Sequence, residues 1–372
     1  MSQGQPTDLT AALRRAYPEL DAVAAVASEP VYVVGGAVRD LLLGRGRADL
    51  DLVVVGDASV LAAKLGAEPV EHERFGTAKV ELDGHAIDIA GARTETYAHP
   101  GALPVVTPAP DIEADLGRRD FSVNAIAIPV GGEASLVDPH GGRADLEAGL
   151  LRVLHPQSFL DDPTRAIRAA RYAARLGFEL EPETARLLPA TDLGAVSAER
   201  RRAELLRLAG EDSGPAGLAL LGEWGLVDLR EGGQALAAGV ARLLERPGWD
   251  EFGPRDEAVL RAALGPLGEE LELAAVRPER PSEGLRLARG RDPITLALAR
   301  VLGAEWLDEF VSFWRAVVLE IDGSELIAAG VPEGPAVGRG LFAARDAKID
   351  GEVSGHDEEL AVALAAARGE SA

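Results

Sequence analysis

The stretch that decides the fold is VGGAVRD at residues 34–40, followed shortly by DLD at residues 49–51. The β-branched residues at 31–34 predict a strand that ends in the glycine pair, and residues 37–43 have helical spacing. The DLD segment predicts a second strand that carries two carboxylates on one face. A polymerase-type nucleotidyl transfer needs a phosphate pocket beside a pair of metal ligands, and this short region can supply both.

Bulk composition predicts an ordered cytoplasmic protein with more than one domain. The chain has 372 residues, enough for two or three domains, and 47% of them are hydrophobic. It has no cysteine, which excludes disulfides and cysteine metal ligands and suits a reducing compartment. We expect no membrane partner, because the N-terminus lacks a signal pattern and no segment approaches the roughly 20 apolar residues of a membrane span.

The formal charge of −23 by itself argues against a nucleic-acid partner. The charge is uneven, however: it is about −10 over residues 1–155, about +1 over residues 156–210 and about −14 over residues 211–372. The middle stretch is dense in arginine, at positions 165, 168, 171, 175, 186, 200, 201, 202 and 207. A polyanion can still dock there with high salt sensitivity, so the net charge does not exclude RNA.

Residues 31–130 predict a mixed α/β unit. Residues 78–82 and 86–89 alternate around an Asp-Gly pair, which predicts a hairpin, and residues 58–65 have helical spacing. Residues 99–110 are rich in proline and small side chains and predict a loop.

From about residue 161 the composition changes to helical segments rich in alanine, leucine and arginine, broken by proline and glycine. Residues 132–142 lie between the α/β segment and the helical segment and mark a predicted domain boundary. The expected fold class is therefore α/β followed by all-α.

Asp49 and Asp51 are the candidate metal ligands. Two carboxylates at that spacing can hold a pair of Mg²⁺ ions roughly 3.5–4 Å apart, which activate a 3′-hydroxyl and stabilise the leaving pyrophosphate. The alternative is an ordinary solvated strand, on which the pattern Asp-x-Asp is frequent.

Gly35, Gly36 and Arg39 are candidate nucleotide-binding residues. Two residues without a Cβ beside a helix N-terminus favour a phosphate, and Arg39 can add a charge-assisted contact. The alternative is a plain strand-to-helix turn. Asp40 is expected to pair locally with an arginine rather than to bind a metal.

Two further clusters complete the set of candidate residues. RRDFSVNA at residues 118–125 places two arginines where they could reach a triphosphate, although the same cluster also suits a charged strand edge. DDPTR at residues 161–165 opens a helix, with Asp162 expected at the N-cap and Pro163 at the first helical position. A basic face follows, which can be functional or merely structural: Arg165, Arg168 and Arg171.

In this order the segments resemble the class II tRNA nucleotidyltransferase/poly(A) polymerase family, whose best-known members are CCA-adding enzymes. The resemblance is dense over residues 31–180 and thinner afterwards. Each motif alone is weak, whereas their order and spacing are specific. The resemblance rests on GGAVRD (35–40), LLG (42–44), DLD (49–51), RRDFSVNA (118–125), VDPHGG (137–142) with DL (145–146), DPTR (162–165) and RYAARLGF (171–178).

The resemblance implies a head with a five-stranded nucleotidyltransferase sheet at residues 1–140. A helical, nucleotide-selecting neck would follow at 141–210, and a helical, tRNA-binding body and tail at 211–372. The histidines are scattered, so the phosphohydrolase domain that some relatives carry is expected to be absent.

The resemblance also implies roles for the candidate residues. Those matching Asp49 and Asp51 bind catalytic Mg²⁺. Those matching Gly36, Arg39 and Arg119 contact the incoming nucleotide, beside Gly35. The neck site consists of the residues matching Asp162, Arg165, Arg168 and Arg171.

The chemistry of Asp162 and Arg165 agrees with a base-selecting role. Cytosine and adenine both present an amine donor next to a ring-nitrogen acceptor, which a carboxylate and a guanidinium can pair. Uracil and guanine reverse the pattern and leave buried polar groups unpaired, at about 1–3 kcal/mol each. Aspartate at position 161, where many relatives have glutamate, makes the supporting role of that residue less certain.

The implied reaction is template-independent, Mg²⁺-dependent addition of C, C and A from CTP and ATP to the 3′ end of tRNA. A poly(A) polymerase, or an enzyme that adds only CC or only A, shares every motif; these activities are thought to differ in a mobile head loop, here around residues 94–110, and in the body. An inactive RNA-binding relative is a third possibility. The arginines at 200–202 either bind RNA or solvate a helix.

Overall fold

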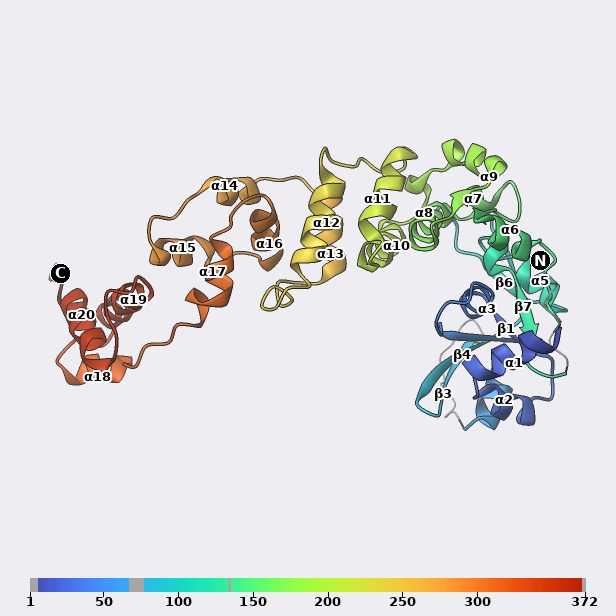
Figure 1. Cartoon of the computed structure of the whole chain (residues 1–372), viewed down its shortest axis with the longest axis horizontal. Coiled ribbons are helices and arrows are strands. Elements are labelled where there is room, and N and C mark those ends of the chain that lie inside the picture. Colours follow the sequence, from blue (N-terminus) through green and yellow to red (C-terminus); the bar gives the residue numbers. More distant parts are fainter. Residues whose placement is uncertain (1–5, 67–76, 133–134, 370–372) are drawn as a thin grey trace. The chain divides into compact units, whose positions relative to one another are not determined.

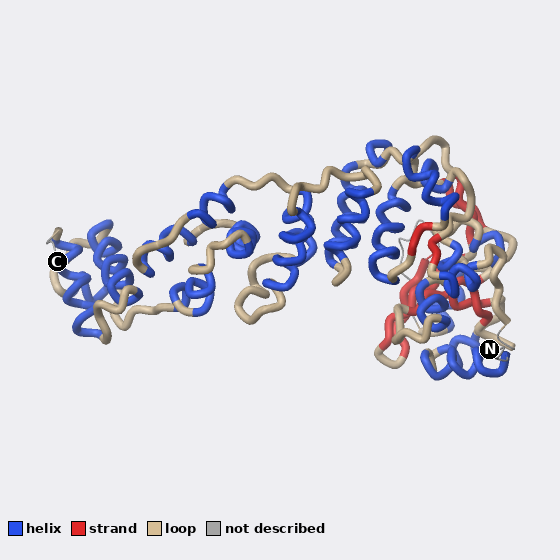
Figure 2. The backbone as a smooth tube through the Cα atoms, turned by 45° about the horizontal axis from the view of Figure 1, so that its top comes forward, coloured by secondary structure: helices blue, strands red, loops and turns tan. Residues whose placement is uncertain are grey.

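The computed structural model describes residues 6–66, 77–132 and 135–369, and the chain forms two compact units. Unit 1 comprises residues 1–208 and 220–227, and unit 2 comprises residues 209–219 and 228–372. The strands, drawn red in Figure 2, belong to unit 1, whereas unit 2 is helical. The finer division at residues 140 and 210 into head, neck and body with tail stays a prediction.

The centre of unit 1 is a five-stranded mixed sheet in the order β3-β4-β2-β1-β7. β2 and β4 are parallel, and the other neighbours are antiparallel. The predicted sheet and the predicted hairpin are confirmed. The strands are β1 (Val31–Val34), β2 (Leu50–Val54), β3 (Thr77–Leu82), β4 (His85–Gly91) and β7 (Ala127–Pro129).

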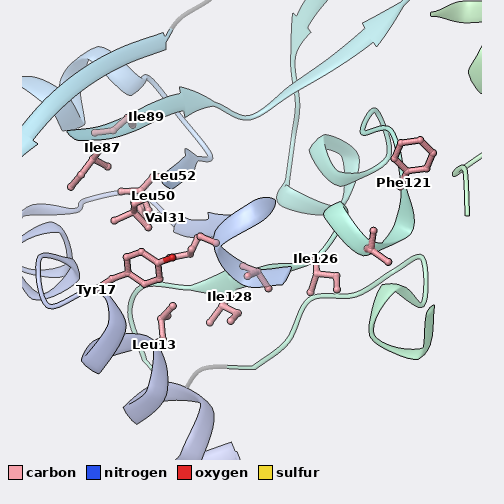
Figure 3. Packing of buried hydrophobic residues seen from close by; sticks show 14 of the residues in the cluster. Leu13, Tyr17, Val31, Leu50, Leu52, Ile87, Ile89, Phe121, Ile126 and Ile128 are labelled. Carbon is pink, nitrogen blue, oxygen red and sulfur yellow. The ribbon is translucent and has the colours of Figure 1, made fainter. Parts of the chain in front are cut away.

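Alternation along the strands divides buried residues between the two faces of the sheet. On one face, Leu13 and Tyr17 pack in the same cluster as Val31, Leu50 and Leu52 (Figure 3). This cluster also includes residues of the helices at that face: α1 (Pro6–Ala16), α2 (Leu20–Val26), α3 (Gly36–Leu42) and α4 (Ala58–Lys64).

The opposite face of the sheet has a smaller apolar cluster, which includes Val34, Val53 and Leu116. Asp51 lies two residues before Val53 on the extended strand and so points toward this second face. β2 begins at Leu50. Asp49 therefore precedes the strand, which corrects the expectation that both carboxylates lie on it.

The segment at residues 99–110, predicted as a loop, contains a strand instead. β6 (Val105–Pro108) pairs antiparallel with β5 (Arg93–Thr96), and the Thr94 and Thr107 hydroxyls are 2.7 Å apart. Proline is tolerated there because a two-stranded ribbon has an unpaired edge on each strand. Within the expected head loop at 94–110, residues 94–96 and 105–108 thus belong to paired strands, whereas residues 97–104 form the loop between them.

Further helices and short strands follow in this part of the chain. They are α5 (Ile112–Leu116), η1 (Ser122–Asn124), α6 (Gly142–Ala148), β8 (Leu150–Leu151), α7 (Ser158–Asp161), α8 (Thr164–Leu176), β9 (Glu179–Leu180), α9 (Pro182–Leu187), η2 (Leu188–Ala190), η3 (Leu193–Ala195) and α10 (Ala198–Gly210). Of the boundary expected at residues 132–142, residues 133 and 134 lie outside the described residues.

The helical array predicted for the second half is confirmed, and Figure 1 labels its helices. α11 (Gly214–Glu223) is divided between the two units. The helices after α11 are α12 (Gly233–Leu243), α13 (Arg255–Leu264), α14 (Glu269–Ala275), α15 (Pro281–Ala288), α16 (Pro293–Val301), α17 (Leu307–Ser312), η4 (Trp314–Ala316), α18 (Gly323–Ala328), α19 (Pro335–Ile349) and α20 (His356–Arg368).

None of the described helices has the length and hydropathy of a membrane span.

Candidate active site

Unit 1 contains a cavity of about 320 Å³ whose wall joins residues from distant parts of the sequence. The glycine turn after β1 and the carboxylate of β2 line it together with the first turns of α8. Most of the predicted site residues are thereby brought together: Gly35, Gly36, Asp51, Arg119, Asp162, Arg165 and Arg168.

The glycine turn lies against the Asp51 carboxylate because β1 and β2 pair with Val34 opposite Asp51. Gly35 has φ +67°, a conformation that side chains with a Cβ rarely adopt. A Cβ at Gly35 would lie 3.3 Å from Nη1 of Arg119 and 3.7 Å from Oδ2 of Asp51. Glycine at this position thus lets an arginine and a carboxylate approach the same turn.

Asp51 has a second carboxylate beside it that the sequence analysis missed. The parallel register of β2 and β4 places Asp88 opposite Asp51. Burial raises the pKa of Asp51 to about 6; Arg119 lowers it, while Asp88 and Asp49 raise it further. The signal available in the sequence was a carboxylate between the apolar Ile87 and Ile89.

Two arginines in the cavity wall are held by one buried carboxylate. Asp115, fully buried on α5, accepts hydrogen bonds from Nε of Arg118 at 2.9 Å and from Nη2 of Arg119 at 3.0 Å. Its spacing of three and four residues from these arginines was the signal that could have identified it. Nε of Arg119 is buried without a hydrogen-bond partner among the described residues.

Other residues of the wall were not among the predicted site residues. The β5 strand contributes Arg93 and Glu95, and Glu95 forms ion pairs with Arg93 and with Arg118. The remaining additions to the wall are Tyr97, Asp120, Asn124 and Tyr172.

At the start of α8, Asp162 is held through one carboxylate oxygen, and Arg165 is held through both terminal guanidinium nitrogens. The helix begins at Thr164, one residue later than expected, and Oδ1 of Asp162 accepts from the backbone N of Thr164 at 3.1 Å. All hydrogen bonds that Asp162 receives from described residues go to Oδ1, which leaves Oδ2 as an available acceptor. Arg165 donates to Oγ of Ser158 at 2.6 Å and to the carbonyl of Arg118 at 2.9 Å.

Three predicted site residues are not in the cavity wall. Asp49 is exposed and precedes β2. Arg39 is buried, where it donates to the Asp40 carboxylate, as expected for Asp40, and to Oδ1 of Asn124. Arg171 lies over the ring of Tyr172, with 5.1 Å between its guanidinium carbon and the ring centroid. Their roles toward a nucleotide stay predictions.

Comparison with known proteins identifies the family. The poly A polymerase head domain family matches residues 31–152. The CC-adding tRNA nucleotidyltransferase of Deinococcus radiodurans is 35% identical over 376 residues, which span 96% of this chain and 93% of that protein. The chain belongs to the tRNA nucleotidyltransferase/poly(A) polymerase family.

Other relatives of this chain differ from it in length, and their names give different activities. The A-adding tRNA nucleotidyltransferase of Halalkalibacterium halodurans is 45% identical over 49% of this chain, and the match spans 45% of that protein. The chain thus covers less than half of that relative. Among solved structures, a complex of a CCA-adding enzyme with CTP is 28% identical, with a TM-score of 0.78 over 97% of this chain and 98% of the other.

Within this family member, Arg200 has a contact that favours a positioning role over free RNA binding. Its guanidinium donates to Oδ1 of Asp162 at 3.2 Å and to the carbonyl of Gly101 at 2.9 Å. Gly101 in turn donates its N–H to the carbonyls of residues 160 and 161. Arg200 therefore connects α10 to the carboxylate at the start of α8.

An ion pair between the buried Asp120 and the partly exposed Arg168 links α8 to the RRD segment. Arg168 lies 2.6 Å from Oδ2 of Asp120, and Asn124 donates to Oδ1 at 3.0 Å. Burial alone raises the pKa of Asp120, but Arg168 and the Asn124 amide outweigh it and lower the pKa to about 2. The charge of Asp120 in turn raises the pKa of Arg168.

We expect the Asp120→Asn variant to lose a stability contribution that depends on pH. Because the folded-state pKa lies below the ordinary 3.8, the contribution is present in full above about pH 4 and disappears as the pH falls through about 2. Its pH-dependent part amounts to about 2 kcal/mol. Urea denaturation of wild type and variant between pH 2 and 7 measures it.

The control variant is Glu113→Gln, which removes one carboxylate at an exposed position of the same unit. It should follow the wild-type stability profile. A difference between wild type and Asp120→Asn that stays constant from pH 7 to pH 3 would contradict the assignment.

Proposed function

We propose that this chain adds C, C and A, from CTP and ATP, to the 3′ end of tRNA, with release of pyrophosphate. The observation that carries the proposal is the single cavity in which Asp51 and Arg119 meet Asp162 and Arg165. Asp51 and Arg119 suit the reacting triphosphate, whereas Asp162 and Arg165 suit the base. A nucleotide could therefore be chosen and joined at one place without a nucleic-acid template.

We assign the phosphate end of the cavity to Gly35, Gly36 and Arg119, with Arg118 beside them. Guanidinium groups held by Asp115 keep a fixed orientation, which favours charge-assisted contacts to phosphate oxygens. The unpartnered Nε of Arg119 and the open turn at Gly35 support this assignment.

We propose Mg²⁺ as the cofactor, held by Asp51 and Asp49 with Asp88 as a further ligand. Within the described residues, no three histidine or carboxylate side chains already form a metal site. The carboxylates nevertheless fit a hard divalent cation, because burial and mutual repulsion raise the pKa of Asp51 and a cation would offset both. When bound, Mg²⁺ supplies charge stabilisation to the attacking 3′-oxygen and to the leaving pyrophosphate.

We assign base selection to Asp162 and Arg165. Oδ2 of Asp162 can accept from the exocyclic amine of cytosine or adenine, and the Arg165 guanidinium can donate to the ring nitrogen. The bonds from Arg165 to Ser158 and to the carbonyl of Arg118 hold the guanidinium in place. Arg168 and Arg171 complete the proposed neck site, with Arg39 as a further nucleotide contact.

The second candidate is a CC-adding enzyme, which is favoured by the full-length match to the D. radiodurans protein. An A-adding enzyme is supported by the H. halodurans relative, and a poly(A) polymerase shares the same family. An inactive RNA-binding relative is disfavoured because the carboxylates are retained. A cytoplasmic location agrees with a tRNA substrate and with the absence of cysteine.

The deciding experiment offers the purified protein tRNA transcripts that end before, within and after the terminal CC. Labelled CTP and ATP are supplied separately and together, and product lengths are read on a gel. Sequential addition of C, C and A supports the proposal. Extension that stops after CC, addition of A alone, or a long A tract would replace it with the corresponding alternative. No incorporation would refute all four activities: CCA addition, CC addition, A addition and poly(A) synthesis.

We expect Asp51→Ala and Asp49→Ala each to reduce incorporation at least about 10³-fold while tRNA binding persists, because the metal ligands are lost. Single-turnover incorporation and filter binding measure the two effects. The exposed Glu81→Ala, on β3 of the same sheet, serves as the control. Wild-type turnover in either aspartate variant would contradict the assignment of these residues as metal ligands.

We expect Asp162→Asn to reduce the preference for CTP over UTP about 10-fold, because the amide can donate to uracil where the carboxylate could only accept. Asparagine also caps helices well, so α8 should persist. The readout is the ratio of kcat/KM for the two nucleotides. Asp57→Asn, which alters the cap of α4 away from the cavity, is the matched control, and an unchanged ratio in Asp162→Asn would refute base selection by this residue.

A further inference from the structure

The proposed metal ligand Asp49 ends a segment, residues 45–49, that has no regular secondary structure between α3 and β2. The residue after it, Leu50, is the first that β2 pairs with β4. Asp49 therefore lies one residue outside this ladder. Ligand side chains have to be held within about 0.5 Å of the productive geometry, so the backbone before Asp49 needs a support of its own.

The hydroxyl of Tyr17 provides such a support. It donates to the carbonyl of Ala48 at 3.2 Å and accepts from the Ala48 N–H at 3.2 Å, which a phenol can do at the same time. Tyr17 lies between α1 and α2, is 1% exposed and packs in one cluster with Leu13 and Leu50 (Figure 3). Burial raises the pKa of Tyr17, so the hydroxyl keeps its proton at neutral pH.

Arg47 attaches the same segment to the same place. Its guanidinium donates to the carbonyl of Ala16 at 2.9 Å and forms an ion pair with the buried Glu19. It also lies over the Tyr17 ring, with 4.8 Å between the guanidinium carbon and the ring centroid. A buried carboxylate requires a partner, so the Glu19 charge favours this position of Arg47. Both residues directly before Asp49 are therefore held by residues 16–19.

We propose that Tyr17 is a positioning residue for metal binding by Asp49. Tyr17 does not line the cavity, so it acts through the backbone: its hydroxyl holds the peptide before Asp49, and β2 holds the peptide after it. Groups that orient a ligand without touching the ion contribute to metal affinity. Without the hydroxyl, a divalent cation would be bound less tightly although every carboxylate is still present.

The inference rests on the proposed function for the assignment of Asp49 as a metal ligand. Its first test needs no substrate, because Mn²⁺ can replace Mg²⁺ and the electron paramagnetic resonance signal of free Mn²⁺ falls as the ion binds. The Asp49→Ala variant is the reference. Mn²⁺ binding that wild type has and Asp49→Ala lacks defines the site.

The test variant is Tyr17→Phe, which removes the hydroxyl and keeps the buried ring. We expect the dissociation constant for Mn²⁺ to rise about 10-fold. Peptides that cover residues 44–50 should exchange deuterium about 5-fold faster, because the Ala48 N–H loses its acceptor. Half-maximal incorporation should require about 10-fold more Mg²⁺, whereas kcat and KM for CTP at saturating Mg²⁺ stay unchanged.

Two control variants separate positioning from stability. Tyr32→Phe removes a tyrosine hydroxyl from β1 of the same sheet and should leave the Mn²⁺ affinity unchanged. Val23→Ala shortens a fully buried side chain of α2 in the cluster that contains Tyr17. It should lower the melting temperature, measured by circular dichroism, without changing the Mn²⁺ affinity or the Mg²⁺ requirement.

Unchanged Mn²⁺ affinity in folded Tyr17→Phe would overturn the proposal, as would an equal loss in Val23→Ala or a fall in kcat that persists at saturating Mg²⁺. If Tyr17→Phe does not fold, Arg47→Gln releases the same segment by removing the ion pair with Glu19. That variant should also weaken Mn²⁺ binding, and unchanged affinity there would overturn the proposal.

The outcomes also separate this inference from the proposed function. Wild type that binds Mn²⁺ no more tightly than Asp49→Ala would refute both the inference and the metal assignment. If Tyr17→Phe weakens Mn²⁺ binding as expected but wild type incorporates no nucleotide, the inference stands and the proposed function fails.

Discussion

The candidate active site depends on the partly buried ion pair between Arg168 and Asp120. Arg168 is on α8, whereas Asp120 directly follows Arg118 and Arg119, so the pair joins α8 to the arginines at the other side of the cavity wall. A partly buried pair of this kind is favourable only when hydrogen bonds complete it, and Asn124 supplies one. After removal of Arg168, the Asn124 amide, the Phe121 N–H and the charge of Arg165 would stabilise the Asp120 carboxylate only in part.

Several charged side chains of this cavity are oriented by hydrogen bonds to neighbouring residues. Asp115 holds Arg118 and Arg119, Ser158 holds Arg165, and Arg200 holds Asp162. Selection of a base by a protein requires such rigidity, because discrimination comes from hydrogen bonds that only one base edge can complete. Side chains that are not held in one orientation could rotate and form hydrogen bonds with the edge of either base.

The distribution of charge matters more for this chain than its total. Unit 1 gathers arginines and carboxylates into one cavity, and arginines also line a cavity of the acidic unit 2. Coulomb interactions between exposed groups are screened within about 8–10 Å in physiological salt. A local cluster can therefore attract a polyanion although the whole molecule is strongly negative.

The sequence by itself determined the strand, glycine turn and helix at residues 31–43, the β3–β4 hairpin and the capped start of α8, because these follow from periodicity and turn chemistry. It misjudged residues 99–110, where proline concealed β6, and it placed Asp49 on a strand that begins at Leu50. Only the tertiary structure set Asp88 beside Asp51 and Arg200 beside Asp162. Strand register and helix docking depend on packing between segments far apart in the chain, which no local pattern encodes.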